Sequence, residues 1–257
     1  KRVWIDSQTE DEILRGIREA KDASEYDSLS DSAYLRAKED YLIGINDETR
    51  MGALRFKHKE ENSFISATDD YNVPPFENLR KLEQAALDFE QTEFTDDKAL
   101  QLLLKPGSSL GGARPKATVK DGNGVLWIAK FPSQNDEYNT GAWEKVTSDL
   151  ARMAGLNVPE TMKKDFNSKG STFLTKRFDR KYQNGKIKRI HCASALTMLG
   201  KVDGADNKDG SSYLELVDFI KDNSIQPNKD LEELWNRIVF SILVSNTDDH
   251  LRNHNFI

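Results

Sequence analysis

The spacing of apolar residues changes along this chain, from strand-like segments in the first half to helix-like segments in the second. Segments 116–119 and 125–130 flank Asp121-Gly122-Asn123-Gly124, a sequence that favours the tight turn of a β-hairpin. From residue 231 to 244, apolar residues instead recur at helical spacing. A strand-bearing part followed by a mostly helical part is typical of a two-lobed enzyme. We therefore predict an α+β protein with two lobes.

The same patterns place the remaining elements and the boundary between the lobes. They predict helices at 10–25, 77–91, 143–154, 192–199 and 213–220, and strands at 41–45, 51–56, 63–68 and 171–178. The Lys/Arg-rich stretch 179–188, which contains Gly185, is the expected hinge. The first lobe is then residues 1–178 and the second is residues 179–257.

Composition excludes several classes of protein. The formal net charge of -6 argues against a protein that mainly wraps nucleic acid, although 37 Lys and Arg residues are compatible with a local basic patch. The single cysteine, Cys192, excludes an internal disulfide and fits a reducing compartment. No apolar run approaches the roughly 20 residues of a membrane span. We therefore expect a cytoplasmic protein without a membrane partner.

The segment 246–256 is the densest run of reactive side chains, with two Asp, two His, three Asn and an Arg directly behind an apolar helix. Such side chains are costly to hold near a core unless they bind something. Asp248 precedes Asn253 by five residues, with His250 between them. A phosphotransferase needs a carboxylate that accepts the proton of the acceptor hydroxyl, and an oxygen ligand for magnesium. Asp248 and Asn253 are the candidates for these two roles.

Two upstream segments suit a phosphate-binding site. Segment 106–116 contains three glycines and two serines ahead of a strand, and glycine lets backbone N–H groups approach phosphate oxygens. It lacks the Walker pattern, and an ordinary flexible loop is the alternative. Lys130 ends an apolar strand about twenty residues later, where a kinase holds its phosphate-binding lysine, and Glu144 on the next helix could orient it. A surface lysine at a strand end is the alternative.

Three weaker signals complete the set. The segment 173–180 leads from an apolar strand into a charged turn, which suits either a lobe linker beside an adenine pocket or an ordinary strand end. His250 and His254 have the spacing of two helical metal ligands, so a metal-dependent hydrolase is a distant alternative. Cys192 follows His191, but neighbours in sequence rarely face each other, and a buried structural cysteine is the better interpretation.

Taken in order, these segments resemble the HipA family of bacterial toxin kinases, from about residue 40 to the end of the chain. Ser-Ser-Leu-Gly-Gly-Ala-Arg-Pro-Lys (108–116) is similar to the family's phosphate loop, and Trp-Ile-Ala-Lys-Phe-Pro (127–132) to its ATP-lysine strand. Lys-Arg-Phe-Asp-Arg (176–180) is similar to its hinge, and Asn-Thr-Asp-Asp-His-Leu-Arg-Asn (246–253) to its catalytic loop. Segments 51–56, 154–159 and 211–216 add further similarity.

The resemblance implies a bilobal fold distantly similar to eukaryotic protein kinases, and ATP- and Mg²⁺-dependent phosphorylation of serine or threonine on a protein. Family toxins act on aminoacyl-tRNA synthetases and usually accompany a helix-turn-helix antitoxin, through which any DNA contact would be indirect. By resemblance Asp248 is the catalytic base and Asn253 binds magnesium. His250, between them, is expected to brace the catalytic loop by hydrogen bonding. Ser109, or the adjacent Ser108, matches a serine that is autophosphorylated in some members. The implied nucleotide-binding residues are Ser109, Gly111, Gly112, Ala113, Lys116, Lys130, Lys176 and Phe178.

Two other functions stay open beside this one. A catalytically inactive nucleotide-binding module that binds an antitoxin would keep the same motifs, and the same lobes can serve a lipid or small-molecule kinase. The family also carries a Tyr-Asp motif some twenty residues after the catalytic loop, for a second metal contact. This chain stops at Ile257 before any such motif, and it begins with Lys rather than Met. We therefore expect it to be truncated at both ends.

Overall fold

A computed structural model describes residues 45–59, 62–65, 73–91, 114–166, 169–183, 185–202, 204–205, 208 and 210–257. These residues divide into two compact units. The sheet unit contains the described residues from 45 to 149 together with Pro159–His191. The helical unit contains Leu150–Val158 and the described residues of Cys192–Ile257.

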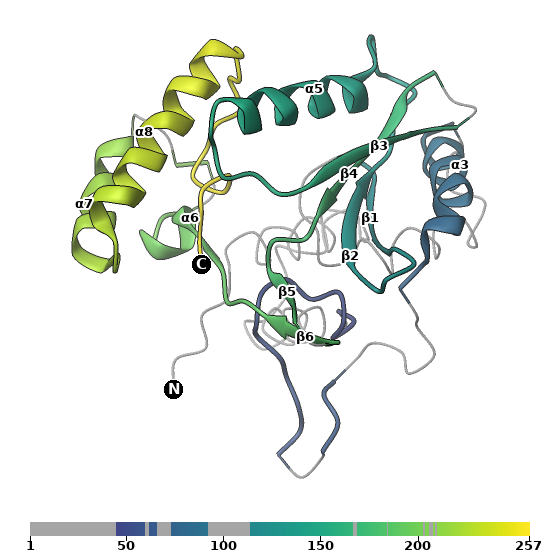
Figure 1. Cartoon of the computed structure of the whole chain (residues 1–257), viewed down its shortest axis with the longest axis horizontal. Helices are drawn as coiled ribbons and strands as arrows, with labels where there is room; N and C mark the ends of the chain where they lie inside the picture. Colours follow the sequence, from purple (N-terminus) through teal and green to yellow (C-terminus); the bar gives the residue numbers. More distant parts are fainter. Residues whose placement is uncertain are drawn as a thin grey trace, which may run out of the picture. The chain divides into compact units, whose positions relative to one another are not determined.

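A four-stranded antiparallel sheet forms the centre of the sheet unit (Figure 1). Its strands are β1 (Lys116–Lys120), β2 (Leu126–Lys130), β3 (Thr161–Asp165) and β4 (Ser171–Lys176), in the order β1-β2-β4-β3. The predicted hairpin is confirmed, since β1 pairs with β2 around a turn in which Gly124 has a φ of 77°. Positive φ is readily adopted by glycine, which explains the residue at this point of the turn.

Helix α3 (Leu79–Gln91) packs on this sheet and forms the core with it. The short 3-10 helix η2 (Phe76–Asn78) leads into α3, close to the predicted helix 77–91. Side chains at helical spacing on α3 meet alternating side chains of the strands, as the periods of helix and strand require. The core residues are Leu79, Leu82, Ala86, Ala117, Val119, Trp127, Ala129, Phe131 and Leu174.

Helix α5 (Thr140–Met153) begins directly against β4. Gly141 allows this approach, because a Cβ there would lie 1.9 Å from the carbonyl oxygen of Ser171. Asn139 fixes the same point: its Oδ1 accepts from the N–H of Ala142 at 3.0 Å and from that of Ser171 at 2.9 Å. The start of α5 is therefore tied to the sheet, which determines where its first turns place their side chains.

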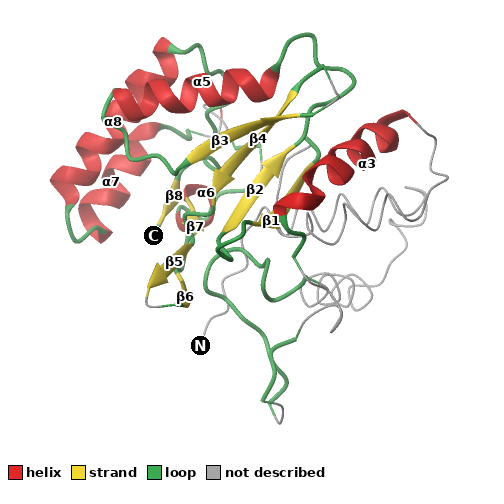
Figure 2. Cartoon of the chain, turned by 45° about the vertical axis from the view of Figure 1, so that its right-hand side comes forward, coloured by secondary structure: helices red, strands yellow, loops and turns green. Residues whose placement is uncertain are grey.

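The helical unit contains β7 (Ala193–Ser194), α6 (Ala195–Met198), α7 (Tyr213–Asn223), α8 (Pro227–Leu243) and β8 (Asn255–Phe256) (Figure 2). Its core is formed by Ala195, Leu216, Ile220 and Leu234, with Leu251 and Phe256 packed against them. Strand β8 pairs with β7, so the last residues of the chain return to the start of the unit. Within the described residues, none of the helices is long and apolar enough to cross a membrane.

Several local predictions differ from the structure. Residues 179–188, expected as a hinge, form a hairpin of β5 (Arg180–Gln183) and β6 (Lys186–Arg189) inside the sheet unit. Residues 192–199 are helical only at α6, because the residues before α6 pair with β8. Strand β3 is not predicted by the sequence, because its Lys-Lys-Asp ending has no apolar alternation.

The strand expected at 51–56 is also absent, and residues 63–65 of the expected strand 63–68 are not extended in a sheet. Gly52 has a φ of 70°, and backbone carbonyls in this region accept hydrogen bonds from arginine side chains instead of from a neighbouring strand. The expected elements at 10–25 and 41–44 lie outside the described residues.

Candidate functional site

Lys130 and Glu144 form an ion pair in the sheet unit. Lys130 is the last residue of β2, and its Nζ lies 2.7 Å from Oε2 of Glu144 on the second turn of α5. The same Nζ lies 5.7 Å from the ring centroid of Phe173 on β4. The side chains are 36% and 26% exposed, so the ammonium group is oriented by its partner and still reached by solvent. This is the pairing that the sequence analysis predicted.

The end of the glycine-rich segment lies beside Lys130. The N–H of Phe131, the residue after Lys130, donates to the carbonyl of Pro115 at 3.0 Å. Arg114 donates to the carbonyl of Phe131 at 3.0 Å and forms an ion pair with Asp136. Burial alone would raise the pKa of Asp136, but the hydrogen bonds and charge of Arg114, with the N–H of Ser133, hold it below the ordinary value. The last residues of the glycine-rich segment, Arg114 and Pro115, are therefore fixed next to the end of β2 that carries Lys130.

Lys116 adds a second cation at this end, since it pairs with Lys130 in the register of β1 and β2. Neighbouring ammonium groups favour a bound anion. The other residues expected to hold the phosphates, Ser109, Gly111, Gly112 and Ala113, lie outside the described residues, as does Ser108.

Lys176 and Phe178 lie at the other end of the sheet. Lys176 pairs with Trp127, three residues before Lys130 on β2, which corresponds to about 10 Å along the strand. Its Nζ lies 3.3 Å from Oε2 of Glu160, and Phe178 is 38% exposed in the following turn. The structure thus separates these two residues from Lys130 along the strand direction.

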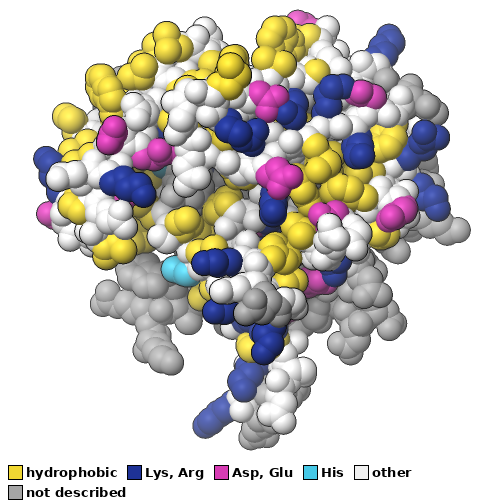
Figure 3. Space-filling model, in the orientation of Figure 1, with side chains coloured by type: hydrophobic (Ala, Val, Ile, Leu, Met, Phe, Trp, Pro, Cys, Tyr) yellow, Lys and Arg dark blue, Asp and Glu magenta, His cyan; other side chains and the backbone are white. Residues whose placement is uncertain are grey.

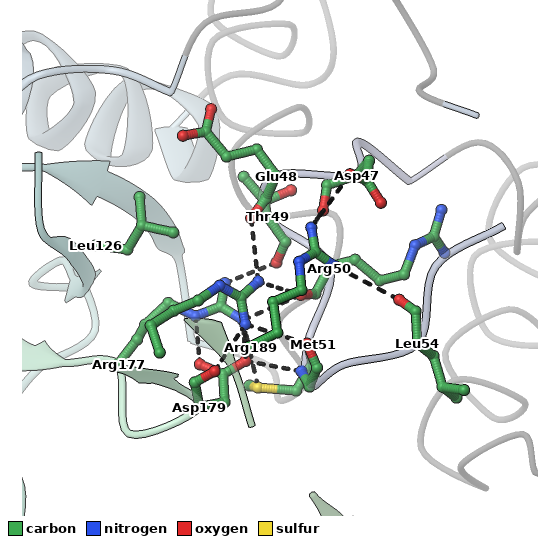
Figure 4. Close-up of polar contacts among 12 residues, drawn as sticks. Asp47, Glu48, Thr49, Arg50, Met51, Leu54, Leu126, Arg177, Asp179 and Arg189 are labelled. Carbon is green, nitrogen blue, oxygen red and sulfur yellow. Dashed lines mark hydrogen bonds and ion pairs between the residues drawn. The ribbon is translucent and has the colours of Figure 1, made fainter. Parts of the chain in front are cut away.

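A buried cluster of charges follows β4 (Figure 4). Asp179 is fully buried and accepts from Arg177 through both carboxylate oxygens, at 2.8 and 2.6 Å, and from Arg180 at 2.6 Å. The N–H of Gly52 also donates to Asp179, at 2.7 Å. We call Arg177, Asp179 and Arg180 the arginine clamp.

The arginine clamp holds a segment that is about 130 residues earlier in the sequence. Arg177 donates to the carbonyls of Thr49 at 2.6 Å and Arg50 at 3.3 Å, and Arg180 donates to that of Gly52 at 3.1 Å. Every charged group of the clamp is thus paired, as buried ions require. Sequence reasoning missed this role, because a charged turn normally indicates a solvated surface.

The pKa values within the clamp follow from burial and neighbouring charge. Burial would raise the pKa of Asp179, but Arg177 and then Arg180 outweigh it, so that pKa lies below the ordinary range. Burial, followed by the like charge of Arg177, lowers the pKa of Arg180 to about 10. Both groups therefore remain ionised at neutral pH.

In the helical unit, a helix end with a fixed hydrogen-bond pattern leads into the candidate catalytic loop. Ser245 has a φ of 55° just beyond α8, and the N–H of Asn246 donates to the carbonyl of Ser241 at 2.9 Å. The N–H of Ser245 donates to the carbonyl of Ile242 at 3.1 Å. These two bonds form a Schellman motif, in which the left-handed position usually holds glycine. A non-glycine residue in this conformation is uncommon and carries some backbone strain.

Asp248 projects from this loop into solvent. Its side chain is 87% exposed, and its own backbone is held by two amide side chains. The N–H of Asp248 donates to Oδ1 of Asn246 at 3.2 Å, and its carbonyl accepts from Nδ2 of Asn253 at 2.6 Å. The loop therefore fixes the backbone of Asp248 and leaves the carboxylate available to an incoming hydroxyl group.

His250 lies where it can brace the loop. Its Nδ1 accepts from the N–H of Arg252 at 3.3 Å, so the proton of the neutral ring is on Nε2. That Nε2 lies 3.7 Å from Oδ1 of Asp248. This distance is longer than a hydrogen bond but keeps the ring beside the carboxylate.

A second carboxylate, Asp249, points to the interior of the unit. It accepts from the hydroxyl of Tyr213 at 2.8 Å and lies 3.0 Å from Nε2 of His254. Burial, with the hydrogen bond to Asp249, raises the pKa of Tyr213 to about 12. Sequence reasoning had considered His254 only as a metal ligand. Its position beside Asp249 instead connects the loop to α7.

Asn253 offers an oxygen donor next to Asp248. Because Nδ2 of Asn253 is used by Asp248, its carbonyl oxygen points away from that bond, and oxygen is the ligand that magnesium prefers. Magnesium needs few protein ligands, since water and phosphate oxygens supply the rest. Among the described residues, no group of three His, Cys, Asp or Glu side chains could hold a metal ion, as a zinc site would require.

Comparisons with known proteins find a matching family model and several relatives. A family model described as the HipA-like C-terminal domain matches residues 108–257, more than half of the chain. "Putative kinase" of Haemophilus influenzae is 29% identical over 189 residues, covering 66% of this chain and 53% of that protein. "Putative kinase Y4dM" of Sinorhizobium fredii is 28% identical over 149 residues, covering 53% and 34%. The chain thus spans about half the length of the first relative.

One solved structure shares the fold. It is the complex of HipA with HipB and operator DNA from Shewanella oneidensis MR-1, with a TM-score of 0.60 and 19% sequence identity. The match covers 89% of this chain and 55% of that chain. At this identity the match supports the mixed helix and strand architecture alone.

Proposed function

Because this chain belongs to the HipA-like C-terminal domain family, we propose that it is part of an ATP-dependent serine/threonine protein kinase of the HipA toxin type. The observation that carries the proposal is the ion pair of Lys130 with Glu144, on a strand and the helix that follows it. Protein kinases use such a pair to hold the phosphates of ATP. In this proposal the sheet unit and the helical unit belong to the two lobes of a kinase.

Each candidate residue has a role in phosphoryl transfer. Lys130 and Lys116 neutralise the phosphates, together with the backbone around Ser109. Asp248 accepts the proton of a serine or threonine hydroxyl as that oxygen bonds to the γ-phosphorus, and the bond to the β-phosphate oxygen breaks to release ADP. His250 and Asn253 keep the loop in place. Asn253 would also hold Mg²⁺, which supplies charge neutralisation at the phosphates.

We further propose a protein substrate, such as an aminoacyl-tRNA synthetase, and a helix-turn-helix antitoxin as partner. The support for a partner is the Shewanella complex, which contains HipB and operator DNA. In this scheme DNA is reached through the antitoxin. Lys176 and Phe178 would line the adenine side of the nucleotide site, and Ser109 would be the site of autophosphorylation.

Calorimetric titration with ATP and magnesium tests the nucleotide site. We expect Lys130→Ala to lose a charged hydrogen-bonding partner worth about 1.5–3 kcal/mol, which weakens ATP binding roughly 10- to 150-fold. Lys145→Ala is the matched control, because Lys145 is also ion-paired, with Asp149 one turn along α5. Equal affinity of the wild type and Lys130→Ala would contradict the proposal.

Transfer of labelled phosphate then separates a kinase from an inactive nucleotide-binding module. Asp248→Asn should bind ATP like the wild type and transfer phosphate about 10²- to 10⁴-fold more slowly, the range for loss of a general base. Transfer to lipid or to a small molecule, with none to protein, would support the alternative kinase class. Tight ATP binding without any transfer by the full-length protein would support the inactive module.

A further inference from the structure

Hairpin β5–β6 presents a one-sided charged surface. Side chains alternate between the two faces of a strand, so Lys181 and Gln183 share a face of β5. Their partners across the hairpin are Lys188 and Lys186, which therefore lie on the same face. All four side chains are exposed. We call these four residues the lysine face.

The lysine face has no internal counter-charge. Lys181 lies directly opposite Lys188 in the register, and like charges at such positions destabilise a sheet. The sequence from Arg180 to His191 contains no Asp or Glu. Within the described part of the chain, none of the three lysines forms an ion pair, whereas lysines elsewhere, such as Lys130 and Lys120, do. An unbalanced surface of this kind in a chain of net charge -6 indicates an anionic ligand.

The opposite side of the hairpin is fixed to the sheet unit. Arg180 belongs to the arginine clamp, and the hydroxyl of Tyr182 accepts from the N–H of Leu126 at 2.6 Å. Arg189 forms an ion pair with Asp47 at 3.3 Å. The lysine face is therefore supported by buried and half-buried contacts, and it would bind a ligand without first being ordered. Figure 3 shows Lys and Arg side chains among acidic and hydrophobic side chains on the face in view.

We propose that the lysine face binds the phosphodiester backbone of a nucleic acid. Lysine is a compact point charge suited to phosphate, and Gln183 in the same row can donate to or accept from a base edge. A two-stranded ribbon is narrow enough to enter the major groove of DNA. Lysine is depleted from protein interfaces, which makes an acidic protein the weaker candidate. The face also lacks the apolar side chains that anchor a protein to a membrane surface.

This binding is independent of kinase activity and revises the expectation that nucleic acid is reached only through a partner. The test measures binding of the 257-residue chain to a labelled duplex DNA and to a labelled stem-loop RNA, without ATP, at several salt concentrations. Three phosphate contacts predict a slope of log affinity against log salt of about -2.7 for duplex DNA, or roughly 40-fold weaker binding at about 200 mM than at about 50 mM.

The variant Lys181→Gln/Lys186→Gln/Lys188→Gln should lose this salt-dependent binding. Its melting temperature should equal or exceed that of the wild type, because the opposed charges are gone. The matched control removes three exposed lysines from α3 and the β3–β4 end of the sheet, as Lys81→Gln/Lys164→Gln/Lys169→Gln. It makes the same change in net charge and should bind like the wild type.

The outcomes distinguish a nucleic acid from other anionic ligands. Stronger binding of either DNA or RNA identifies the natural class and supports the proposal. Equal loss of binding in the control variant would overturn it, because a general charge effect would then explain the result. Binding of a poly-glutamate peptide or of anionic lipid vesicles with the same affinity and the same dependence on the three lysines would also overturn it.

Discussion

The arginine clamp and the loop around Asp248 are both charged turns that follow an apolar element, and the structure uses their charges in opposite ways. Asp179 is fully buried and paired with two arginines that are themselves buried. Asp248 is 87% exposed, and only its backbone is held by neighbours. In the arginine clamp, the charged groups hold together two chain segments that are far apart in sequence. The second leaves a carboxylate able to react.

Burial therefore distinguishes a charged group that supports the fold from one that is available to a substrate. A buried carboxylate whose oxygens all accept internal hydrogen bonds is out of reach of a substrate hydroxyl and is engaged by its own donors. An exposed carboxylate on an anchored backbone has both the freedom and the position that a general base needs. The same Asp→Asn change should therefore lower stability at Asp179 and slow phosphate transfer at Asp248.

The largest effect is expected for Asp179→Asn. Removing the anion leaves Arg177 and Arg180 buried without their partner, and breaking a buried ion pair typically costs about 3–5 kcal/mol. Urea denaturation should show this loss as a lower free energy of unfolding. Asp218→Asn is the control, because Asp218 is 76% exposed and 3.7 Å from Lys221. It should change stability by less than about 0.5 kcal/mol.

A stability change for Asp179→Asn as small as that of the control would mean that water or rearrangement compensates for the lost charge. Burial would then not distinguish a structural carboxylate from a reactive one, even at Asp179, where the difference in burial is greatest.

Acid should weaken the same clamp. Burial would raise the pKa of Asp179, but Arg177 and Arg180 lower it below its value in the unfolded chain, which is about 3.9. The stabilising contribution of Asp179 is therefore complete above that pH and is lost as pH falls through the folded pKa. The difference in free energy of unfolding between wild type and Asp179→Asn should shrink below about pH 4. A difference that is independent of pH would show that Asp179 does not titrate in this range.

The spacing of apolar residues predicts the helices and strands well, but it does not predict the arginine clamp. The hairpin turn at 121–124, α3 and α8 were predicted because a local pattern determines them. The strand expected at 51–56 failed for a non-local reason. The carbonyls of Gly52 and Leu54 within it accept from Arg180 and Arg189, about 130 residues later in the chain, and no pattern within the segment indicates that.

In the candidate site, too, contacts between distant segments could not be predicted from local sequence patterns. The Lys130–Glu144 pair could be anticipated, since a strand and the helix after it are joined by a short connection. The contacts of Asp249 with Tyr213 and His254 could not, because Tyr213 lies 36 residues away on another helix. In sequence, Asp248 and Asp249 are equivalent neighbours. They differ in exposure because Asp249 contacts Tyr213 and His254, whereas the side chain of Asp248 lies in solvent.

Asp249→Asn should have an intermediate effect on stability. Asp249 is a charged acceptor for Tyr213, and hydrogen bonds to charged groups contribute about 1.5–3 kcal/mol. A double-mutant cycle with Tyr213→Phe measures the pair directly, and we expect the two losses to be less than additive. Strict additivity would show that the hydroxyl and the carboxylate do not interact, and the loop would then need another anchor.

The smallest effect on stability is expected for Asp248→Asn, although its effect on phosphate transfer should be large. The two hydrogen bonds at this residue use its backbone N–H and carbonyl, which asparagine keeps. The exposed side chain contributes little, so the free energy of unfolding should change by less than about 0.5 kcal/mol. Urea denaturation of Asp248→Asn beside Asp179→Asn compares one chemical change in two environments. A loss above about 1.5 kcal/mol at Asp248 would place its carboxylate among the structural contacts of the loop. A reduced rate of transfer in that variant would then reflect a disordered loop, and it could not be assigned to the missing base.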